Sequence, residues 1–356
     1  MNQTTKNRDL EAMFTAFKEK SASYLKNYKF LFSLNNIDVG TAEKELCFQS
    51  DKTALYHYSP LSDSPQKVPT LVVYALVNRP YMLDLQPDRS LVRNLLSHGV
   101  DLYMIDWGYP DRSDQYLTMD DYINGYLDDC VDYVKRRTGH HKVNLIGICQ
   151  GGTFATIYTA LNPTKVKNLV TMVTPIDFSS DEALLFKWSR FIDVDTMVDA
   201  LGIIPADFLN LGFMMVRPFD RLLKYVNFLE NLDQKEKTLN FLRMEKWIFD
   251  SPGQAGECYR QFIKDLYQEN KLVQDRLDIG GKQVHLSQIS MPVLNIYARY
   301  DHIVPPAATI ALQKHITSKD TELYEFEGGH IGLFVSSKTQ KEVGPAVAQW
   351  LRQRDR

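Results

Sequence analysis

The sequence predicts an α/β protein with a mostly parallel, doubly wound sheet that is interrupted late in the chain by a helical cap insertion. Runs that are apolar at nearly every position predict strands buried on both faces, as parallel sheets require. Helical patterns separate these runs, which indicates right-handed crossovers between parallel strands. The strand runs are Thr70–Leu76, Asp101–Ile105, Val143–Ile146 and Leu169–Val173, and the helical patterns include Asp88–Ser97 and Asp120–Arg137.

The alternation stops after Thr174-Pro175 and resumes about a hundred residues later. Residues 177–287 carry Leu, Phe, Trp, Met and Lys at helical spacings, without clear strands. Strand patterns return at Met291–Ala298 and Glu322–Phe326, and a final helix is expected near Gln340–Arg352. We therefore expect a cap, or lid, at 177–287, inserted into an α/β core made of residues 36–176 and 288–356.

The beginning of the chain has a different pattern. Residues 1–35 form an expected N-terminal helical segment, with an amphipathic helix from about Asp9 to Tyr28. Two strands, Glu45–Gln49 and Ala54–Tyr58, are predicted next. The first residues lack the apolar run of a signal peptide, and the longest apolar stretch is far shorter than the ~20 residues of a transmembrane helix. We expect a cytoplasmic protein without a transmembrane segment.

Composition argues against several classes of function. The 356 residues carry a net charge of −3, so no basic excess indicates a nucleic-acid partner. The four cysteines are scattered without a CxxC pair, which argues against a zinc site or a disulfide framework. No two histidines have the spacing of metal ligands. We therefore expect no metal.

The most informative motif is Gly147-Ile-Cys149-Gln150-Gly151-Gly152, between an apolar strand and a helical pattern. This is the pattern of a nucleophile elbow, with cysteine where serine is usual. The turn exposes the nucleophile near a helix N-terminus, where free N–H groups favour a thiolate or an oxyanion. Alone, the string also fits a glycine-rich turn beside a buried cysteine. The flanking strand and helix favour the elbow.

Two further motifs follow predicted strands. Asp301 comes just after Met291–Ala298, and His330 lies on a glycine-flanked loop after Glu322–Phe326. Each alone fits a turn or surface residue. Together, the order nucleophile, acid, histidine is that of the α/β-hydrolase fold. We therefore expect Cys149 to be the nucleophile, His330 the general base and acid, and Asp301 the carboxylate that orients His330.

The remaining site predictions are less specific. The backbone N–H of Gln150, with that of Val77 or Asn78, is expected to form the oxyanion hole. His302 is a candidate accessory residue, although a packed loop residue fits equally well. Trp107, in the turn after Asp101–Ile105, fits a packed indole better than a catalytic group.

Several segments resemble the polyhydroxyalkanoate synthases, from about residue 35 to the C-terminus, and the short length resembles the class III catalytic subunit. The resemblance lies in LVVYALVNRPYMLDLQPDRS, LYMIDWGYPD, DDYINGYLDDCVDYV, LIGICQGG, NLVTMVTPIDF, NFLRMEKWIFDSP, NIYARYDHIVPP and GGHIGLFVS. It implies polymerisation of 3-hydroxyacyl-CoA, preferably the short-chain 3-hydroxybutyryl-CoA, to a polyester with release of CoA. The intermediate would be an acyl-Cys149 thioester, with His330 and Asp301 in the roles above.

The same resemblance implies partners and a location. A class III subunit works with a non-catalytic second subunit, in a homodimer or larger hetero-oligomer, at the surface of cytoplasmic polyester granules. No cofactor is implied beyond the CoA thioester substrate. Class IV, with a different small partner, is the nearest alternative within the family.

Two other functions remain open on the residues alone. A cysteine-elbow thioesterase or dienelactone-type hydrolase would release a free acid instead of polymer. A binding scaffold with a vestigial site would not be labelled at Cys149 by a substrate analogue. A thiol attacking a thioester yields another thioester, which retains acyl-transfer potential, so cysteine at the elbow favours transfer.

Overall fold

The computed structural model describes residues 37–232 and 234–355, in two compact units. The larger unit comprises Gly40–Val216 and Trp247–Arg356, and the smaller one comprises Met1–Val39 and Arg217–Lys246. The predicted N-terminal helical segment, residues 1–35, lies outside the described residues. Among the helices that are described, none is long and apolar enough to cross a membrane.

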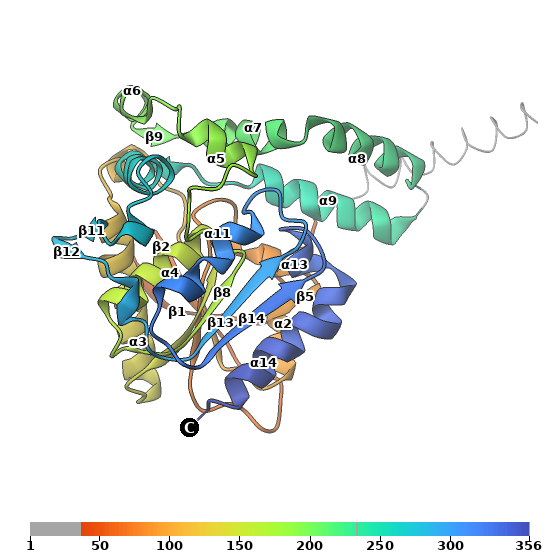
Figure 1. Cartoon of the computed structure of the whole chain (residues 1–356). Coiled ribbons are helices and arrows are strands. Elements are labelled where there is room, and N and C mark those ends of the chain that lie inside the picture. Colours follow the sequence, from red (N-terminus) through yellow and green to blue (C-terminus); the bar gives the residue numbers. More distant parts are fainter. Residues whose placement is uncertain (1–36, 233, 356) are drawn as a thin grey trace, which may run out of the picture. The chain divides into compact units, whose positions relative to one another are not determined.

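An 8-stranded sheet forms the centre of the larger unit, in the order β1-β2-β6-β3-β7-β8-β13-β14 (Figure 1). Its strands are β1 (Glu45–Ser50), β2 (Thr53–Tyr58), β3 (Thr70–Val73), β6 (Leu102–Asp106), β7 (Val143–Ile148), β8 (Val166–Met172), β13 (Val293–Ala298) and β14 (Thr321–Phe326). The β1–β2 and β2–β6 pairs are antiparallel, and all other neighbours in this sheet are parallel. Each of these strands coincides with a predicted one, so the mostly parallel α/β prediction is confirmed.

The central strands are buried on both faces, as their continuous apolar runs predicted. Every residue of β3 and β7 is buried, which fits strands covered on both faces. The predicted strand Thr70–Leu76 was too long at its end, because β3 stops at Val73. Beyond it the chain leaves the sheet, and the Tyr74 carbonyl accepts a 2.8 Å hydrogen bond from Nε1 of Trp107. The apolar run therefore continues past the strand as a buried loop.

Helices cover both faces of the sheet (Figure 1). Helix α2 (Leu91–Ser97) and the C-terminal α14 (Gly344–Arg352) lie side by side on one face. On the other face, α4 (Gln150–Leu161) packs against β7 and β8, near α3 (Asp128–Thr138). Shorter helices in the C-terminal part are α11 (Pro306–Ile310), α12 (Leu312–His315) and α13 (Gly332–Val335).

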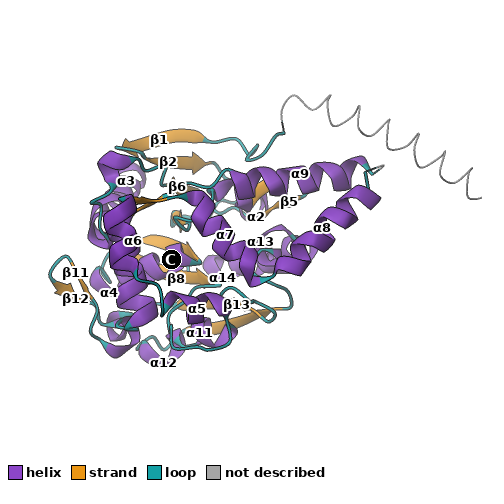
Figure 2. Ribbon diagram, turned by 90° about the horizontal axis from the view of Figure 1, so that it is seen from above, coloured by secondary structure: helices purple, strands orange, loops and turns teal. Residues whose placement is uncertain are grey.

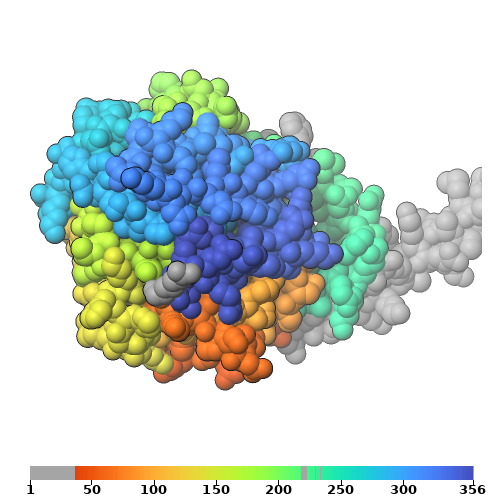
Figure 3. Space-filling model, turned by 60° about the horizontal axis from the view of Figure 1, so that its bottom comes forward, coloured from red at the N-terminus to blue at the C-terminus, as the bar shows by residue number. Residues whose placement is uncertain are grey.

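The C-terminal helix is fastened to the loop before β3. Gln66 Nε2 donates to the Ala348 carbonyl at 3.0 Å, and the Asp355 carboxylate accepts from the backbone N–H groups of Lys67 and Val68. Figure 3 shows the C-terminal segment, in dark blue, beside the orange segment that contains this loop. The two ends of the α/β core are thus held together.

The predicted insertion contains more than helices. Within the larger unit it has α5 (Leu184–Ser189), α6 (Val194–Leu201) and α7 (Ala206–Val216), which are labelled in Figure 2. It also has α10 (Gly256–Gln261), followed by a π-helical segment, η4 (Phe262–Gln268). Short strand pairs, absent from the prediction, join β9 (Ile203–Ile204) to β10 (Gln254–Ala255) and β11 (Asp278–Ile279) to β12 (Lys282–Gln283). Two-residue strands are too short to leave an alternating pattern. A separate cap with bounds 177–287 stays a prediction.

The smaller unit contains α8 (Pro218–Glu230) and most of α9 (Lys235–Phe249). The rings of Phe228 and Phe241 stack with centroids 4.0 Å apart. The Tyr225 hydroxyl donates to Glu245 at 2.6 Å. These contacts join the two helices into a hairpin.

A buried polar cluster fixes β13, the strand that leads to Asp301. Asn295 Oδ1 accepts from the Thr171 hydroxyl of β8 at 2.8 Å, and its Nδ2 donates to the Thr309 carbonyl of α11 at 2.8 Å and to Gln313 Oε1 at 2.7 Å. Asn295 is fully buried. Both the oxygen and the nitrogen of its side-chain amide therefore have hydrogen-bond partners, as is usual for a buried polar group.

We predict that Asn295→Ala lowers the free energy of unfolding by roughly 2 to 3 kcal/mol, because it leaves buried hydrogen-bonding groups without partners. Urea unfolding followed by circular dichroism measures the change. Gln49→Ala is the matched control, because the exposed Gln49 amide also donates to a backbone carbonyl. Equal stability of the Asn295 variant and the parent would show that this amide does not hold β13 in place.

Candidate active site

Cys149 occupies a tight turn between β7 and α4. Its backbone has φ 51° and ψ −124°, a conformation that non-glycine residues rarely adopt. The Cys149 N–H donates to the Met172 carbonyl at 3.0 Å, and its own carbonyl accepts from Gly152 at 2.9 Å. These bonds hold the strained residue between β8 and the first turn of α4. The predicted nucleophile elbow has the expected backbone geometry.

The glycines of the motif are required by close backbone approach. A Cβ on Gly151 would overlap the carbonyl oxygens of Val73 and Tyr74. A Cβ on Gly147 would lie 2.5 Å from the Cα of Gly152. Because neither neighbour is the mobile end of a side chain, α4 can approach β3 and β7 this closely only without those side chains.

Asp301 and His330 meet at the carboxyl edge of the sheet. Asp301 follows β13, and His330 lies between β14 and α13. His330 Nδ1 and Asp301 Oδ2 are 2.7 Å apart, and the Asp301 side chain is 0% exposed. Asp301 Oδ1 accepts from the backbone N–H groups of Ile303 and Val304, both at 2.9 Å. Both oxygens of the Asp301 carboxylate therefore have hydrogen-bond partners, and Oδ2 is the one that faces the imidazole.

The same imidazole also forms a hydrogen bond with the Cys149 side chain. Since Nδ1 is engaged by Asp301, Nε2 is the nitrogen left for the sulfur. Burial alone would lower the pKa of His330, but the charges of Asp301 and Cys149 and the hydrogen bonds to both raise that pKa to about 10. The arrangement therefore favours the charged imidazolium form of His330. The structure brings the three predicted triad residues together.

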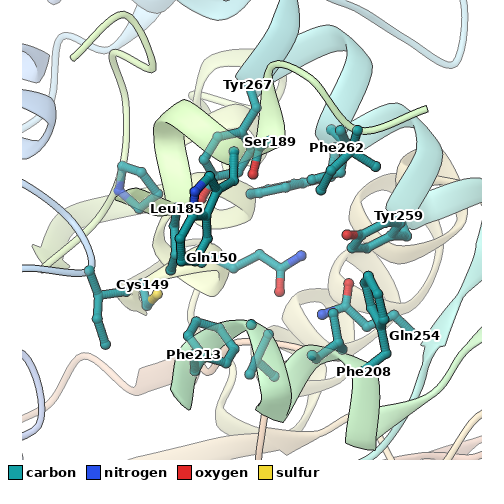
Figure 4. Close-up of a pocket in the computed structure, with 18 of the residues that line it drawn as sticks. Cys149, Gln150, Leu185, Ser189, Phe208, Phe213, Gln254, Tyr259, Phe262 and Tyr267 are labelled. Carbon is teal, nitrogen blue, oxygen red and sulfur yellow. The ribbon is translucent and has the colours of Figure 1, made fainter. Parts of the chain in front are cut away.

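Cys149 opens into a cavity of about 280 Å³ in the larger unit (Figure 4). Its walls are mainly apolar and come largely from the predicted insertion, with Leu185 and Trp188 of α5, Phe208 and Phe213 of α7, and Phe262 of η4. The reactive sulfur thus faces a mainly apolar space, in which an apolar acyl chain would be well accommodated.

The predicted oxyanion-hole residues differ in their positions. Gln150 is the first residue of α4, so its N–H has no partner within the helix. Its side-chain Oε1 accepts from the Leu76 N–H at 3.2 Å, which fixes the loop after β3. Val77 lines the same cavity as Cys149. Asn78 has φ 62°, and its side-chain amide donates to Ser251.

Other residues singled out in the sequence do not line this cavity. His302 is half-buried beside Asp301, and the cavity is not lined by it. Trp107 is buried against Tyr122, with ring centroids 5.5 Å apart, which fits the packed indole that the sequence favoured. Cys47, Cys130 and Cys258 are free thiols outside the cavity lining. Within the described ranges, no group of three or more His, Cys, Asp or Glu side chains could hold a metal ion.

The sequence did not identify the residues that build the cavity. Tyr259, Tyr267 and Gln254 line it and come from the insertion, more than a hundred residues after Cys149. The only sequence signal was the apolar, helical spacing of that segment. Such spacing indicates a buried helix face, but not which side chains face the nucleophile.

Two sequence profiles match the chain. The family described as alpha/beta hydrolase fold matches residues 80–337, and the family described as the poly-beta-hydroxybutyrate polymerase (PhaC) N-terminus matches residues 19–95. Among solved structures, a monoglyceride lipase of Saccharomyces cerevisiae covers 90% of this chain and 98% of its own, with a TM-score of 0.56 and 12% identity. A monoacylglycerol lipase of Paleococcus ferrophilus has a TM-score of 0.53 and 15% identity, over 85% of this chain and 99% of its own. These likenesses confirm the α/β-hydrolase fold.

Curated relatives are much more similar in sequence. The poly(3-hydroxyalkanoate) polymerase subunit PhaC of Allochromatium vinosum is 53% identical over 327 residues, covering 91% of this chain and 92% of its own. The subunit of the same name from Synechocystis is 49% identical over 346 residues, covering 95% and 91%. Similarity of this extent and coverage confirms the resemblance read from the motifs. The chain therefore belongs to the poly(3-hydroxyalkanoate) polymerases, as a catalytic PhaC subunit.

Proposed function

We propose that this polymerase builds its polyester from 3-hydroxyacyl-CoA through a covalent thioester on Cys149. The observation that carries the proposal is the His330 imidazole, which bonds both the Cys149 side chain and the buried Asp301 carboxylate at one end of an apolar cavity. In this arrangement Cys149 is the nucleophile, His330 moves the proton, and Asp301 orients the ring.

Acylation begins with attack by the Cys149 sulfur, for which the thiolate is the nucleophilic form. The Cys149 thiolate attacks the thioester carbonyl of 3-hydroxyacyl-CoA, and a C–S bond forms. When the CoA–sulfur bond breaks, His330, protonated at neutral pH because its pKa is raised, gives its proton to the leaving CoA thiolate. The products are free CoA, acyl-Cys149 and a neutral imidazole.

Elongation uses that neutral imidazole as the base. It takes the proton of the 3-hydroxyl of a second 3-hydroxyacyl-CoA while the hydroxyl oxygen attacks acyl-Cys149. An ester bond forms, the Cys149 thiolate leaves, and the thiolate–imidazolium pair is restored. The lengthened chain is then a CoA thioester that can acylate Cys149 again. One thiol is therefore sufficient for repeated transfer.

The oxyanion formed in both steps needs N–H donors. The N–H of Gln150, at the start of α4, is directed by the elbow toward the reacting carbonyl. For the second donor we favour Val77 over Asn78, because Val77 lines the cavity with Cys149. An accessory role of His302 beside Asp301 stays a prediction.

The cavity supports a preference for transfer over hydrolysis. Its apolar walls disfavour water near the acyl-enzyme, whereas a second hydroxyacyl group can enter with its own apolar carbons. A thioesterase or dienelactone-type hydrolase would need water at this position. We therefore favour polymer formation over release of free acid. From the class III likeness, we propose the short-chain 3-hydroxybutyryl-CoA as the preferred monomer.

Partners and location belong to the same proposal. From the class III likeness we propose a non-catalytic second subunit, in a homodimer or larger hetero-oligomer. We also propose action at the surface of polyester granules in the cytoplasm. The chemistry above needs no cofactor, because the substrate already carries an activated thioester.

We predict that Cys149→Ser forms acyl-enzyme slowly or not at all, and yields essentially no polymer. Serine is a weaker nucleophile here, and an oxygen ester retains less free energy for attack by the next hydroxyl. Intact-protein mass spectrometry after incubation with 3-hydroxybutyryl-CoA measures the adduct, and turbidity measures polymer. Near-normal polymer yield from this variant would contradict the role given to sulfur.

We predict that Asp301→Asn still forms acyl-enzyme in a single turnover but loses most polymer formation. A thiol needs less help from a His–carboxylate couple than a hydroxyl does. Rapid-quench mass spectrometry resolves the first acylation, and CoA release over many turnovers reports elongation. If both steps fell by the same factor, Asp301 would not act mainly in elongation.

The pH dependence follows from the raised pKa of His330. A pKa of about 10, against a reference of 6.5, keeps the proton donor charged through neutral pH. Acylation is therefore expected to stay high at neutral pH and to fall only as pH rises toward 10. Asp301→Asn removes a cause of the raised pKa, so its decline is expected at lower pH. Single-turnover acylation between pH 7 and 10.5 tests this. A decline of the parent near pH 6.5 would show that the imidazole is not held charged.

A further inference from the structure

The catalytic cavity has a polar end that the reaction as described above does not use. Most of its lining is apolar, but Gln254 and Tyr259 also contribute to it. Figure 4 shows the Gln254 amide and the Tyr259 hydroxyl directed into the cavity, on the side away from Cys149. Gln254 is 3% exposed and Tyr259 is 7% exposed. Both groups are thus buried polar side chains that face the substrate space.

Gln254 is buried with an unused acceptor. Within the part of the chain that the structure describes, its side-chain Oε1 has no hydrogen-bond partner. Such orphaned acceptors are uncommon in folded proteins and point to a missing ligand or water. The backbone cannot easily turn the amide elsewhere, because Gln254 lies in β10 and pairs with Ile204 of β9. A donor that enters the cavity would satisfy the oxygen.

Tyr259 supplies a second polar group from the next element. It lies on α10, whose first turn is held by hydrogen bonds from the N–H groups of Glu257 and Cys258 to the carbonyls of Gln115 and Leu117. Its ring packs in a small apolar cluster with Val198 and Ile263. The ring is therefore fixed, and the hydroxyl is held at the cavity surface beside Gln254.

The chemistry of the substrate limits what can reach this end. A 3-hydroxyacyl-CoA offers two kinds of hydrogen-bond donor near the thioester, namely the hydroxyl of the acyl chain and the amide N–H groups of the pantetheine arm. The arm leads to a charged nucleotide, which must remain in water. The rim of the cavity on α5 and α7 is exposed, with Trp188 at 36% and Met215 at 55%. The arm fits the rim, and the acyl chain fits the buried end.

From these observations we infer that Gln254 and Tyr259 bind the free hydroxyl at the end of the acyl chain on Cys149. This inference rests on the proposed acyl-Cys149 intermediate. A hydroxyl both donates and accepts, so it can donate to Gln254 Oε1 and accept from Tyr259. The cavity, at about 280 Å³, has room for more than one four-carbon unit, so the hydroxyl is that of a monomer or of a short oligomer. The site would then select hydroxyacyl groups over acyl groups that cannot be polymerised.

The test compares acylation by substrates that differ only in the terminal hydroxyl. The pairs are 3-hydroxybutyryl-CoA with butyryl-CoA, and the linear dimer of 3-hydroxybutyrate as its CoA thioester with the same dimer lacking its terminal hydroxyl. Rapid-quench intact-protein mass spectrometry gives the first acylation rate of each. In the parent we expect the hydroxylated member of at least one pair to react roughly tenfold faster or more, because a site built for a hydroxyl rejects analogues that lack it.

Gln254→Leu should bring that ratio close to one, and Tyr259→Phe should lower it while keeping the packed ring. Gln66→Leu is the matched control. Gln66 is also a buried glutamine with an unpartnered Oε1, but it lies in the loop before β3 and outside the cavity lining. Its variant should keep the ratio of the parent even if it is less stable.

The outcomes distinguish a failure of the hydroxyl site from a failure of the covalent acyl-Cys149 mechanism. If the parent forms no acyl-enzyme, the covalent mechanism fails. If the parent acylates but Gln254→Leu and Tyr259→Phe keep its ratio for both chain lengths, the hydroxyl site is wrong. An equal loss of rate for hydroxylated and deoxygenated substrates would place these residues on the pantetheine arm instead, which also overturns the inference.

Discussion

The close approach of two backbones at the elbow is the constraint on which the active site depends. The first turn of α4 lies against the end of β3, so near that Gly151 has no room for a Cβ. Cys149 then takes a positive φ, at a cost of about 1–3 kcal/mol for a residue of this kind. Packing around it supplies the compensation. The N–H of Cys149 bonds to β8, and the hydroxyl of Thr153 donates to the Pro175 carbonyl at 2.8 Å. These two bonds join the strained elbow and the first turn of α4 to β8 and to the segment that follows it.

A second consequence of this packing concerns charge. Asp301 is buried without contact to solvent, and a buried carboxylate is tolerated only when its oxygens are bonded. Two backbone N–H groups and His330 fill that need. The imidazole in turn bonds the Cys149 side chain, and its two neighbours raise the pKa of His330. In an apolar cavity such interactions are stronger than they would be in water. The apolar surroundings alone would lower the pKa of His330, and the neighbouring charges and hydrogen bonds raise it.

The sequence predicted the sheet well and singled out three residues that the structure brings together, because both predictions depend on local patterns. The continuous apolar runs predicted the central parallel strands, and the glycines around Cys149 marked the elbow. The predicted strand Thr70–Leu76 extends past the observed end of β3 at Val73, because the buried loop that follows is as apolar as the strand itself. The two-residue strands of the insertion left no periodic signal. The cavity walls were missed for another reason. Which face of α5, α7 or α10 turns toward Cys149 depends on packing between distant segments, and Gln254 carries no motif that links it to the elbow.

The central claim is that the acyl chain is carried by one sulfur. Peptide mapping by tandem mass spectrometry, after a single turnover with 3-hydroxybutyryl-CoA, locates the adduct directly. The account predicts a hydroxybutyryl group on Cys149, with Cys47, Cys130 and Cys258 unmodified. Release of CoA with the acyl group on another residue, or on none, would contradict it.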